Sequence, residues 1–262
     1  MSTTWRFSDL EFLVLWELFT GERLPAPFLF ISTTPMYYDF LREKREVADK
    51  VHARWDRSLD ELAQVFQQPD LRICVDGFDF RDDDEIDSRI RVMALRKAGR
   101  GFIVKQRSGG QSTRGSECTV TECDPIRLAE EVVAGLPEFE AGQQPDIPLV
   151  DTADGEGFDY DHHQSTVSTA LEHRTGFRSK KFLSAPTVCL GTIDIVQGHS
   201  IFGPQGVTAH RLEWRDLIDD GRYVIGGDGS QVATAADAKR FTALINARVA
   251  AVIRAIKDER QI

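Results

Sequence analysis

The sequence predicts an α+β fold built around a mainly antiparallel sheet. The first indication is a hairpin in residues 207–230, where two short strand-like runs flank Asp219-Asp220-Gly221. An Asp-Gly pair between alternating apolar and polar residues is typical of a hairpin, because glycine takes the positive φ that the turn requires. The second indication is that the same pattern occurs in residues 89–104. Each of the two hairpins then runs into an amphipathic helix.

The two hairpins match each other without a gap at a distance of 122 residues. Arg89 corresponds to Arg211, and a strand at 71–75 lines up with residues 193–197. Internal similarity of this kind predicts two copies of one strand–strand–strand–helix unit, whereas the simpler alternative is two unrelated hairpins. We expect one domain over residues 1–262, made of two pseudo-repeats at about 5–137 and 162–258.

The connection between the halves has a composition of its own. Residues 137–161 contain eight acidic residues, no lysine or arginine, and several prolines and glycines. Such a segment buries little apolar surface, so we expect an acidic linker over residues 138–161.

The first half is expected to begin with a short strand from Trp5 to Phe7 and to continue with helices and further strands. Ser8-Asp9-Leu10-Glu11 has the form of a capping box, which predicts a helix up to about Thr20. Residues 38–66 carry apolar residues at three- and four-residue steps, and Asp56 is expected to divide them into two helices. The predicted strands lie at 28–31, 71–78, 89–96, 101–106 and 117–122, and Asp124-Pro125 opens a helix.

The second half is expected to repeat this order with a longer final helix. Residues 164–174 are moderately helical and 176–184 are predicted to be a loop. A strand at 188–196 and a glycine-containing loop at 198–206 precede the hairpin. The clearest helix of the chain covers residues 237–256, with one apolar side.

Composition and charge exclude several classes of protein. The chain of 262 residues is 41% hydrophobic and 28% charged, which is typical of a soluble globular protein. A net charge of −10 argues against nucleic acid as a partner. The apolar runs are too short for a membrane span, and the N-terminus does not resemble a signal peptide. Four cysteines at unrelated spacings indicate reduced thiols, so we expect a cytoplasmic protein.

The search for chemistry leaves only weak candidates. There is no nucleophile elbow and no phosphate-binding loop, and residues 226–229 are a turn rather than a dinucleotide fingerprint. Residues 159–163 form the best metal-like cluster, and the acidic run 79–87 is either a solvated loop or a cation site. We predict no cofactor, no metal site and no catalytic residue. A hydrolase that uses His199, Ser200 and Asp216 as a triad stays an alternative.

The order of elements resembles one family, the EspG chaperones of the ESX (type VII) secretion systems. The segments that carry the resemblance are 69–75, 89–104, 116–124, 191–196, the hairpin from Trp214 to Tyr223, and the terminal helix. The acidic stretch 138–161 matches nothing in that family.

That resemblance implies a central twisted, mainly antiparallel sheet flanked by two helical bundles, with quasi-twofold symmetry between the halves. It also implies a non-enzymatic cytosolic chaperone. Such a protein would bind the tip of a PE–PPE heterodimer through PPE, keep the pair soluble and target it to the secretion machinery. The alternatives are the hydrolase and a structural self-associating protein, and a weak homodimer is left open. The sequence does not specify which PE–PPE pair or secretion system is served.

We place the partner surface on the second half, at the open face of the 207–226 hairpin, the loop 198–206 and the adjoining C-terminal helix. The first hairpin is rich in arginine and lysine, which are costly to desolvate beneath an apolar partner. The loop 198–206 instead offers Ile201 and Phe202, and the second hairpin offers Trp214 and Tyr223, aromatic types that are common in interface hot spots and equally common in cores. The predicted binding residues are Ile201, Phe202, Arg211, Glu213, Trp214, Tyr223 and Ile225.

Overall fold

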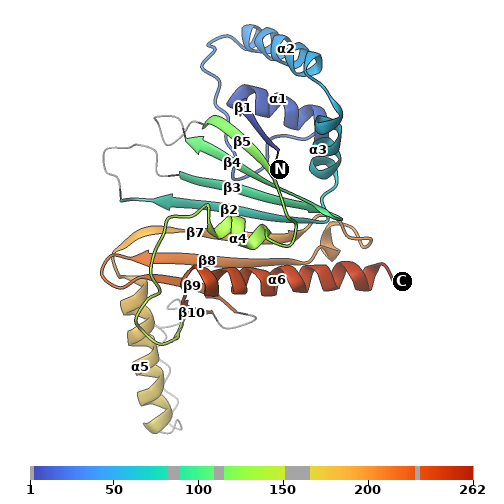
Figure 1. Cartoon of the computed structure of the whole chain (residues 1–262). Coiled ribbons are helices and arrows are strands. Elements are labelled where there is room, and N and C mark those ends of the chain that lie inside the picture. The colour runs from blue at the N-terminus through green and yellow to red at the C-terminus, as the bar shows by residue number, and fades with distance from the viewer. Residues whose placement is uncertain (1–2, 82–88, 109–114, 151–165, 228–230, 262) are drawn as a thin grey trace.

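One antiparallel sheet runs through the whole protein. The computed structural model describes residues 3–81, 89–108, 115–150, 166–227 and 231–261, and within them ten strands form a single sheet (Figure 1). Its order is β1-β5-β4-β3-β2-β7-β8-β9-β10-β6, and all neighbouring strands pair antiparallel. The predicted α+β class with a mainly antiparallel sheet is confirmed.

The first half begins as the local sequence predicts. The Ser8 hydroxyl accepts a hydrogen bond from the Glu11 N–H, and the Glu11 carboxylate accepts one from the Ser8 N–H, which completes the capping box. Asp56 caps the second helix of the divided pattern. Residues 28–31 are not a strand; Phe28 is buried there, and the Leu29 N–H donates to the Gln106 side chain. The elements are β1 (Thr4–Ser8), α1 (Asp9–Thr20), α2 (Tyr37–Ala53), α3 (Arg57–Gln67), β2 (Leu71–Asp79), β3 (Arg89–Lys97), β4 (Arg100–Ser108), β5 (Gly115–Cys123) and α4 (Leu128–Val133).

The second half departs from the prediction at two places. Residues 176–184, which we expected to be a loop, belong mostly to a helix, and the described part of the acidic linker contributes an edge strand. The elements are β6 (Ile147–Pro148), α5 (Thr166–Leu183), β7 (Thr187–Gln197), the 3-10 turn η2 (Pro204–Gly206), β8 (Ala209–Leu217), β9 (Arg222–Gly226), β10 (Val232–Ala235) and α6 (Ala238–Glu259).

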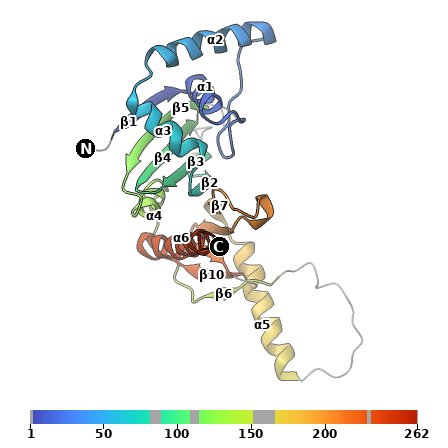
Figure 2. The ribbon, with the colours of Figure 1, turned by 90° about the vertical axis from the view of Figure 1, so that its right-hand side faces the viewer.

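The two faces of the sheet are covered differently. Helices α4 and α6 pack on one face, where Ile73, Ile193 and Trp214 join Phe241 in the main core. On the other face, α1 and α3 cover β3–β5, and Phe182 of α5 covers β9 and β10. Figure 2 shows α1–α3 and α5 at opposite ends of the molecule. Between them, every second residue of β2 and β7 stays half-buried, so the centre of this face is partly open.

The gapless 122-residue match between the hairpins is wrong as a structural alignment. Leu71 pairs with Arg96, so the match requires Ile193 to pair with Ile218, but Ile193 pairs with Leu212 instead. The turns differ in length: two residues separate β3 from β4, whereas residues 218–221 separate β8 from β9. A longer turn changes the register of its own hairpin, so Lys97 pairs with Arg100 in β3–β4, whereas Asp216 pairs with Arg222 in β8–β9. The order of strands outward from β2 and from β7 is nevertheless the same.

No helix in the described part of the chain combines the length and the apolar character needed to cross a membrane.

Candidate protein-binding surface

The loop 198–206 presents apolar side chains to solvent. It follows the end of β7, and Gly203 at φ +78° supplies a backbone conformation that other residues rarely adopt. Ile201 is 58% exposed and Phe202 is 63% exposed, as the sequence predicted for a loop flanked by glycines. We name this segment the Phe202 loop.

A carboxylate from the end of α6 anchors the Phe202 loop. Glu259 accepts hydrogen bonds from the Gln197 side chain at 2.9 Å, the Ser200 hydroxyl at 2.8 Å and the Ile201 N–H at 3.1 Å. The Gln197 amide, followed by the other donors, holds the pKa of Glu259 below its ordinary value, so the anchor stays ionised at neutral pH. The base of the loop is therefore held in place, while its apolar tip remains exposed.

A cleft of about 500 Å³ adjoins this loop, and sequence reasoning missed it. Its walls come from four segments that are far apart in the chain: residues 67–70 from the end of α3 to just before β2, Lys97 at the end of β3, the loop itself and the end of α6. Pro69, Ile201 and Ile256 are among its apolar lining residues, and Asp70 forms an ion pair with Arg260 at 3.4 Å. No local pattern could reveal it, because the cleft depends on the pairing of β2 with β7.

Arg211 and Glu213 lie on the partly open sheet face, on β8, the strand that follows the loop. Arg211 is exposed and donates two hydrogen bonds to Asp194 of the neighbouring strand, at 2.6 and 2.8 Å. This ion pair raises the pKa of Arg211. Glu213 is half-buried on the same side of β8. Four of the seven predicted binding residues are thus accessible to a partner.

The other three are core residues, which corrects the predicted surface. Trp214 is fully buried under α6, on the face opposite Arg211. Tyr223 is fully buried against Phe182, and its hydroxyl donates to Asp220 at 2.9 Å. Ile225 is 3% exposed in the same small core. The alternation along the strands was predicted well, but both faces are covered at these positions.

The hypothetical hydrolase triad is not assembled. The Ser200 hydroxyl donates to Glu259, whereas Asp216 is buried in an ion pair with Arg222. Asp216 pairs with Cys189 near the other end of β7, about 26 Å along the strand from Gln197. His199 lies next to Ser200, so Asp216 is out of reach of both.

The two candidate cation sites from the sequence, residues 79–87 and 159–163, lie mostly outside the described residues. Asp79 forms a salt bridge with Arg81, and residues 82–88 of the acidic run lie outside the described residues. The cluster 159–163 lies outside them too. Among the residues that are described, no group of three metal-ligating side chains is placed to hold an ion.

Comparison with known proteins agrees with this architecture. The model of the EspG family matches residues 8–247. The chain belongs to the EspG family. Its fold is similar to that in the structure of the Mycobacterium tuberculosis type VII secretion system chaperone EspG5 in complex with the PE25–PPE41 dimer. The TM-score is 0.57 at 13% sequence identity, over 92% of this chain and 94% of the other. At 13% identity, this comparison shows that the two chains share a fold. No curated protein matches the sequence.

Proposed function

We propose that this EspG-family chain is a non-enzymatic cytosolic chaperone of ESX (type VII) secretion. It binds the tip of a PE–PPE heterodimer through the PPE protein, keeps the pair soluble and targets it to the secretion machinery. The main support is the family match over most of the chain, together with a shared fold with EspG5, which was solved with a PE–PPE dimer bound.

The proposal includes a quasi-twofold arrangement of the two halves. Its axis passes through the antiparallel pair β2–β7, from which strands follow outward in equivalent order. Helices α1–α3 on the first half and α5 on the second flank the partly open face, as the two helical bundles of the family would. The registers differ, so the repeat holds at the level of elements and not of aligned residues.

Docking is proposed at the Phe202 loop and the adjoining face of β8. Ile201 and Phe202 supply an apolar centre, and Arg211 and Glu213 supply a polar rim that sets the orientation. Because Glu259 holds the base of the loop, little conformational entropy is lost there when a partner binds.

The test replaces both exposed apolar residues of the loop with aspartate. We expect the double variant Ile201→Asp/Phe202→Asp to bind a cognate PE–PPE heterodimer about 100-fold more weakly than the parent, because two charges would be buried against an apolar tip. Isothermal titration calorimetry measures the affinity, and circular dichroism checks the fold.

The chain provides a matched control in Ile126→Asp/Phe177→Asp. This control also replaces one isoleucine and one phenylalanine. Ile126 lies just before α4 and is 78% exposed, and Phe177 lies on α5 and is 71% exposed. The control should bind like the parent. A folded Ile201→Asp/Phe202→Asp variant with unchanged affinity would show that the partner docks elsewhere.

A further inference from the structure

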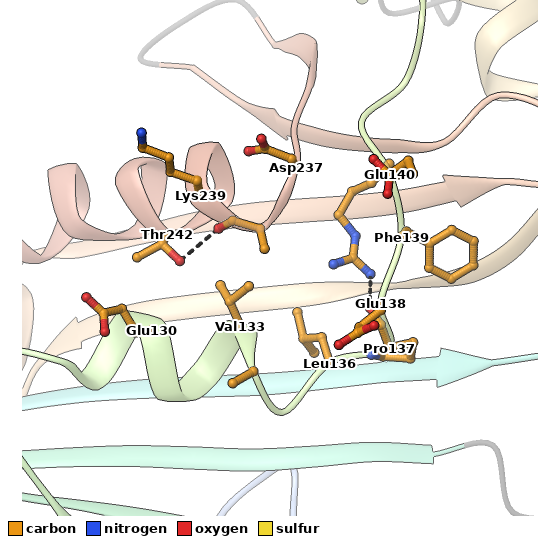
Figure 3. A pocket seen from close by; sticks show the side chains of 13 residues that line it. Glu130, Val133, Leu136, Pro137, Glu138, Phe139, Glu140, Asp237, Lys239 and Thr242 are labelled. Atoms are coloured by element: carbon orange, nitrogen blue, oxygen red, sulfur yellow. Dashed lines mark hydrogen bonds between the residues drawn. The ribbon is translucent and has the colours of Figure 1, made fainter.

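A second groove lies on the face of the sheet that α4 and α6 cover, opposite to the partly open face. It runs between α4 and the N-terminal end of α6. It has a volume of about 900 Å³ (Figure 3). Val133 and Leu136 come from α4 and the residues that follow it, and Phe139 comes from the described part of the linker. Ala238 and Thr242 line the α6 side. The groove therefore has an apolar floor between two helical walls.

The floor of this groove is firmly held. Arg222 is 2% exposed, donates to both carboxylate oxygens of Asp216 at 2.7 Å and donates to the Pro137 carbonyl at 2.8 Å. The guanidinium groups of Arg81 and Arg222 lie 5.0 and 5.6 Å from the centre of the Phe139 ring. These contacts fix the shape of the groove without using its solvent-facing surface.

The rim of the groove is acidic. Because Arg222 is paired with Asp216, and Glu130 is paired with Arg127 at 2.7 Å, the remaining charges in the lining are three carboxylates and one lysine. Glu138 and Glu140 are exposed and form no ion pair among the described residues. Asp237 accepts from the Arg240 N–H as the N-cap of α6, so its full charge outweighs the roughly half positive charge of the helix end. The three carboxylates are Glu138, Glu140 and Asp237, and the lysine is Lys239.

We propose that the α4–α6 groove binds a basic amphipathic segment of a partner protein. An apolar floor with an acidic rim is complementary to a peptide that has leucine-like side chains on one side and lysine or arginine on the other. The groove is separate from the Phe202 loop. Thr242 and Glu259 lie about 26 Å apart along α6, so the two surfaces can be occupied together.

The probe is a labelled peptide of leucine and lysine in which leucine recurs at three- and four-residue steps, so that a helix carries leucine on one side and lysine on the other. Its acidic counterpart with glutamate in place of lysine is the control. Fluorescence anisotropy on the full chain should show binding of the basic peptide alone. Glu138→Lys/Glu140→Lys should weaken it about tenfold, and Ala134→Trp, which fills the groove, should weaken it similarly. Glu46→Lys/Asp49→Lys on the exposed side of α2 and Ala247→Trp on α6 are the matched controls.

The outcomes separate this proposal from the proposed function. Binding of the PE–PPE pair should be unchanged in Glu138→Lys/Glu140→Lys, and peptide binding should be unchanged in Ile201→Asp/Phe202→Asp. The proposal is overturned if the basic peptide does not bind. Equal weakening by the α2 control would also overturn it, because it would reveal general attraction to an acidic protein. The proposal is also overturned if the chain associates with itself through this groove and the peptide is therefore unable to bind.

Discussion

Replacing Arg222 with methionine is expected to lower the free energy of unfolding by about 3–5 kcal/mol, because it leaves Asp216 buried without its partner. Asp216 has no exposed surface, and the two side chains form a bidentate pair with both distances at 2.7 Å. Denaturation in urea measures the loss. The double variant Asp216→Asn/Arg222→Met removes both charges and should recover part of it.

Arg211 provides the matched control for this buried pair. It forms a similar bidentate pair with Asp194, but its side chain is 62% exposed. Exposed ion pairs contribute about 1 kcal/mol or less, so Arg211→Met should cost little. Equal losses in Arg222→Met and Arg211→Met would contradict the role assigned to burial.

The Arg222→Met variant should also respond to pH in a defined direction. Desolvation already raises the pKa of Asp216 in the folded protein, while Arg222 opposes the rise. Without Arg222 the folded-state pKa rises further, so the folded state binds the proton more tightly than the unfolded state. The variant should therefore be more stable near pH 5 than near pH 8, since its stability falls as pH rises between the unfolded and folded pKa values.

Replacing Trp214 with alanine is expected to cost about 3–5 kcal/mol, because the indole is fully buried and its loss leaves a cavity. The ring lies against the backbone of two glycines on neighbouring strands. A Cβ atom at Gly77 would lie 2.7 Å from the Trp214 Cη2 atom, and one at Gly191 would lie 2.3 Å from it. Denaturation of Trp214→Ala measures the cost, and exposed Phe202→Ala should change stability by less than about 0.5 kcal/mol.

A double-mutant cycle tests why these positions are glycine. Gly191→Ala should be destabilising in the parent, because its Cβ would lie 2.3 Å from the Trp214 ring and 2.4 Å from the Asp76 carbonyl oxygen. The Trp214→Phe background removes the ring contact and leaves the carbonyl contact, so the destabilisation should be smaller there but not absent. If the two substitutions are additive, the close approach of the ring to Gly191 is not what constrains that residue.

Local chemistry explains how much of this fold could be predicted. The capping box at Ser8, the divided helix at Asp56 and the strand alternation depend on neighbours in the chain, and the structure has them as predicted. The site was harder, because Trp214 and Phe202 are both large aromatic residues in the same half of the sequence. Phe202 is exposed because it lies on a loop, whereas Trp214 is core because α6 packs over its face of the sheet, which the sequence around Trp214 does not show.

In the acidic linker, the composition predicted too little structure. Its acidic residues predicted a solvated connection, yet the Gly142 N–H donates to the Arg222 carbonyl and Ile147 pairs with Ala233 as part of the sheet. Gly142 also gives Tyr223 its space, since a Cβ atom there would lie 2.1 Å from the ring. These contacts join residues about 80 positions apart, so no local pattern reports them.

The most direct measurement is light scattering on a gel-filtration column, after co-expression of this chain with a PE–PPE heterodimer from the same genome. We predict one stable species whose mass equals one copy each of the EspG-family chain, the PE protein and the PPE protein. Elution of this chain apart from every such heterodimer that is itself folded and soluble would contradict its proposed role as their chaperone.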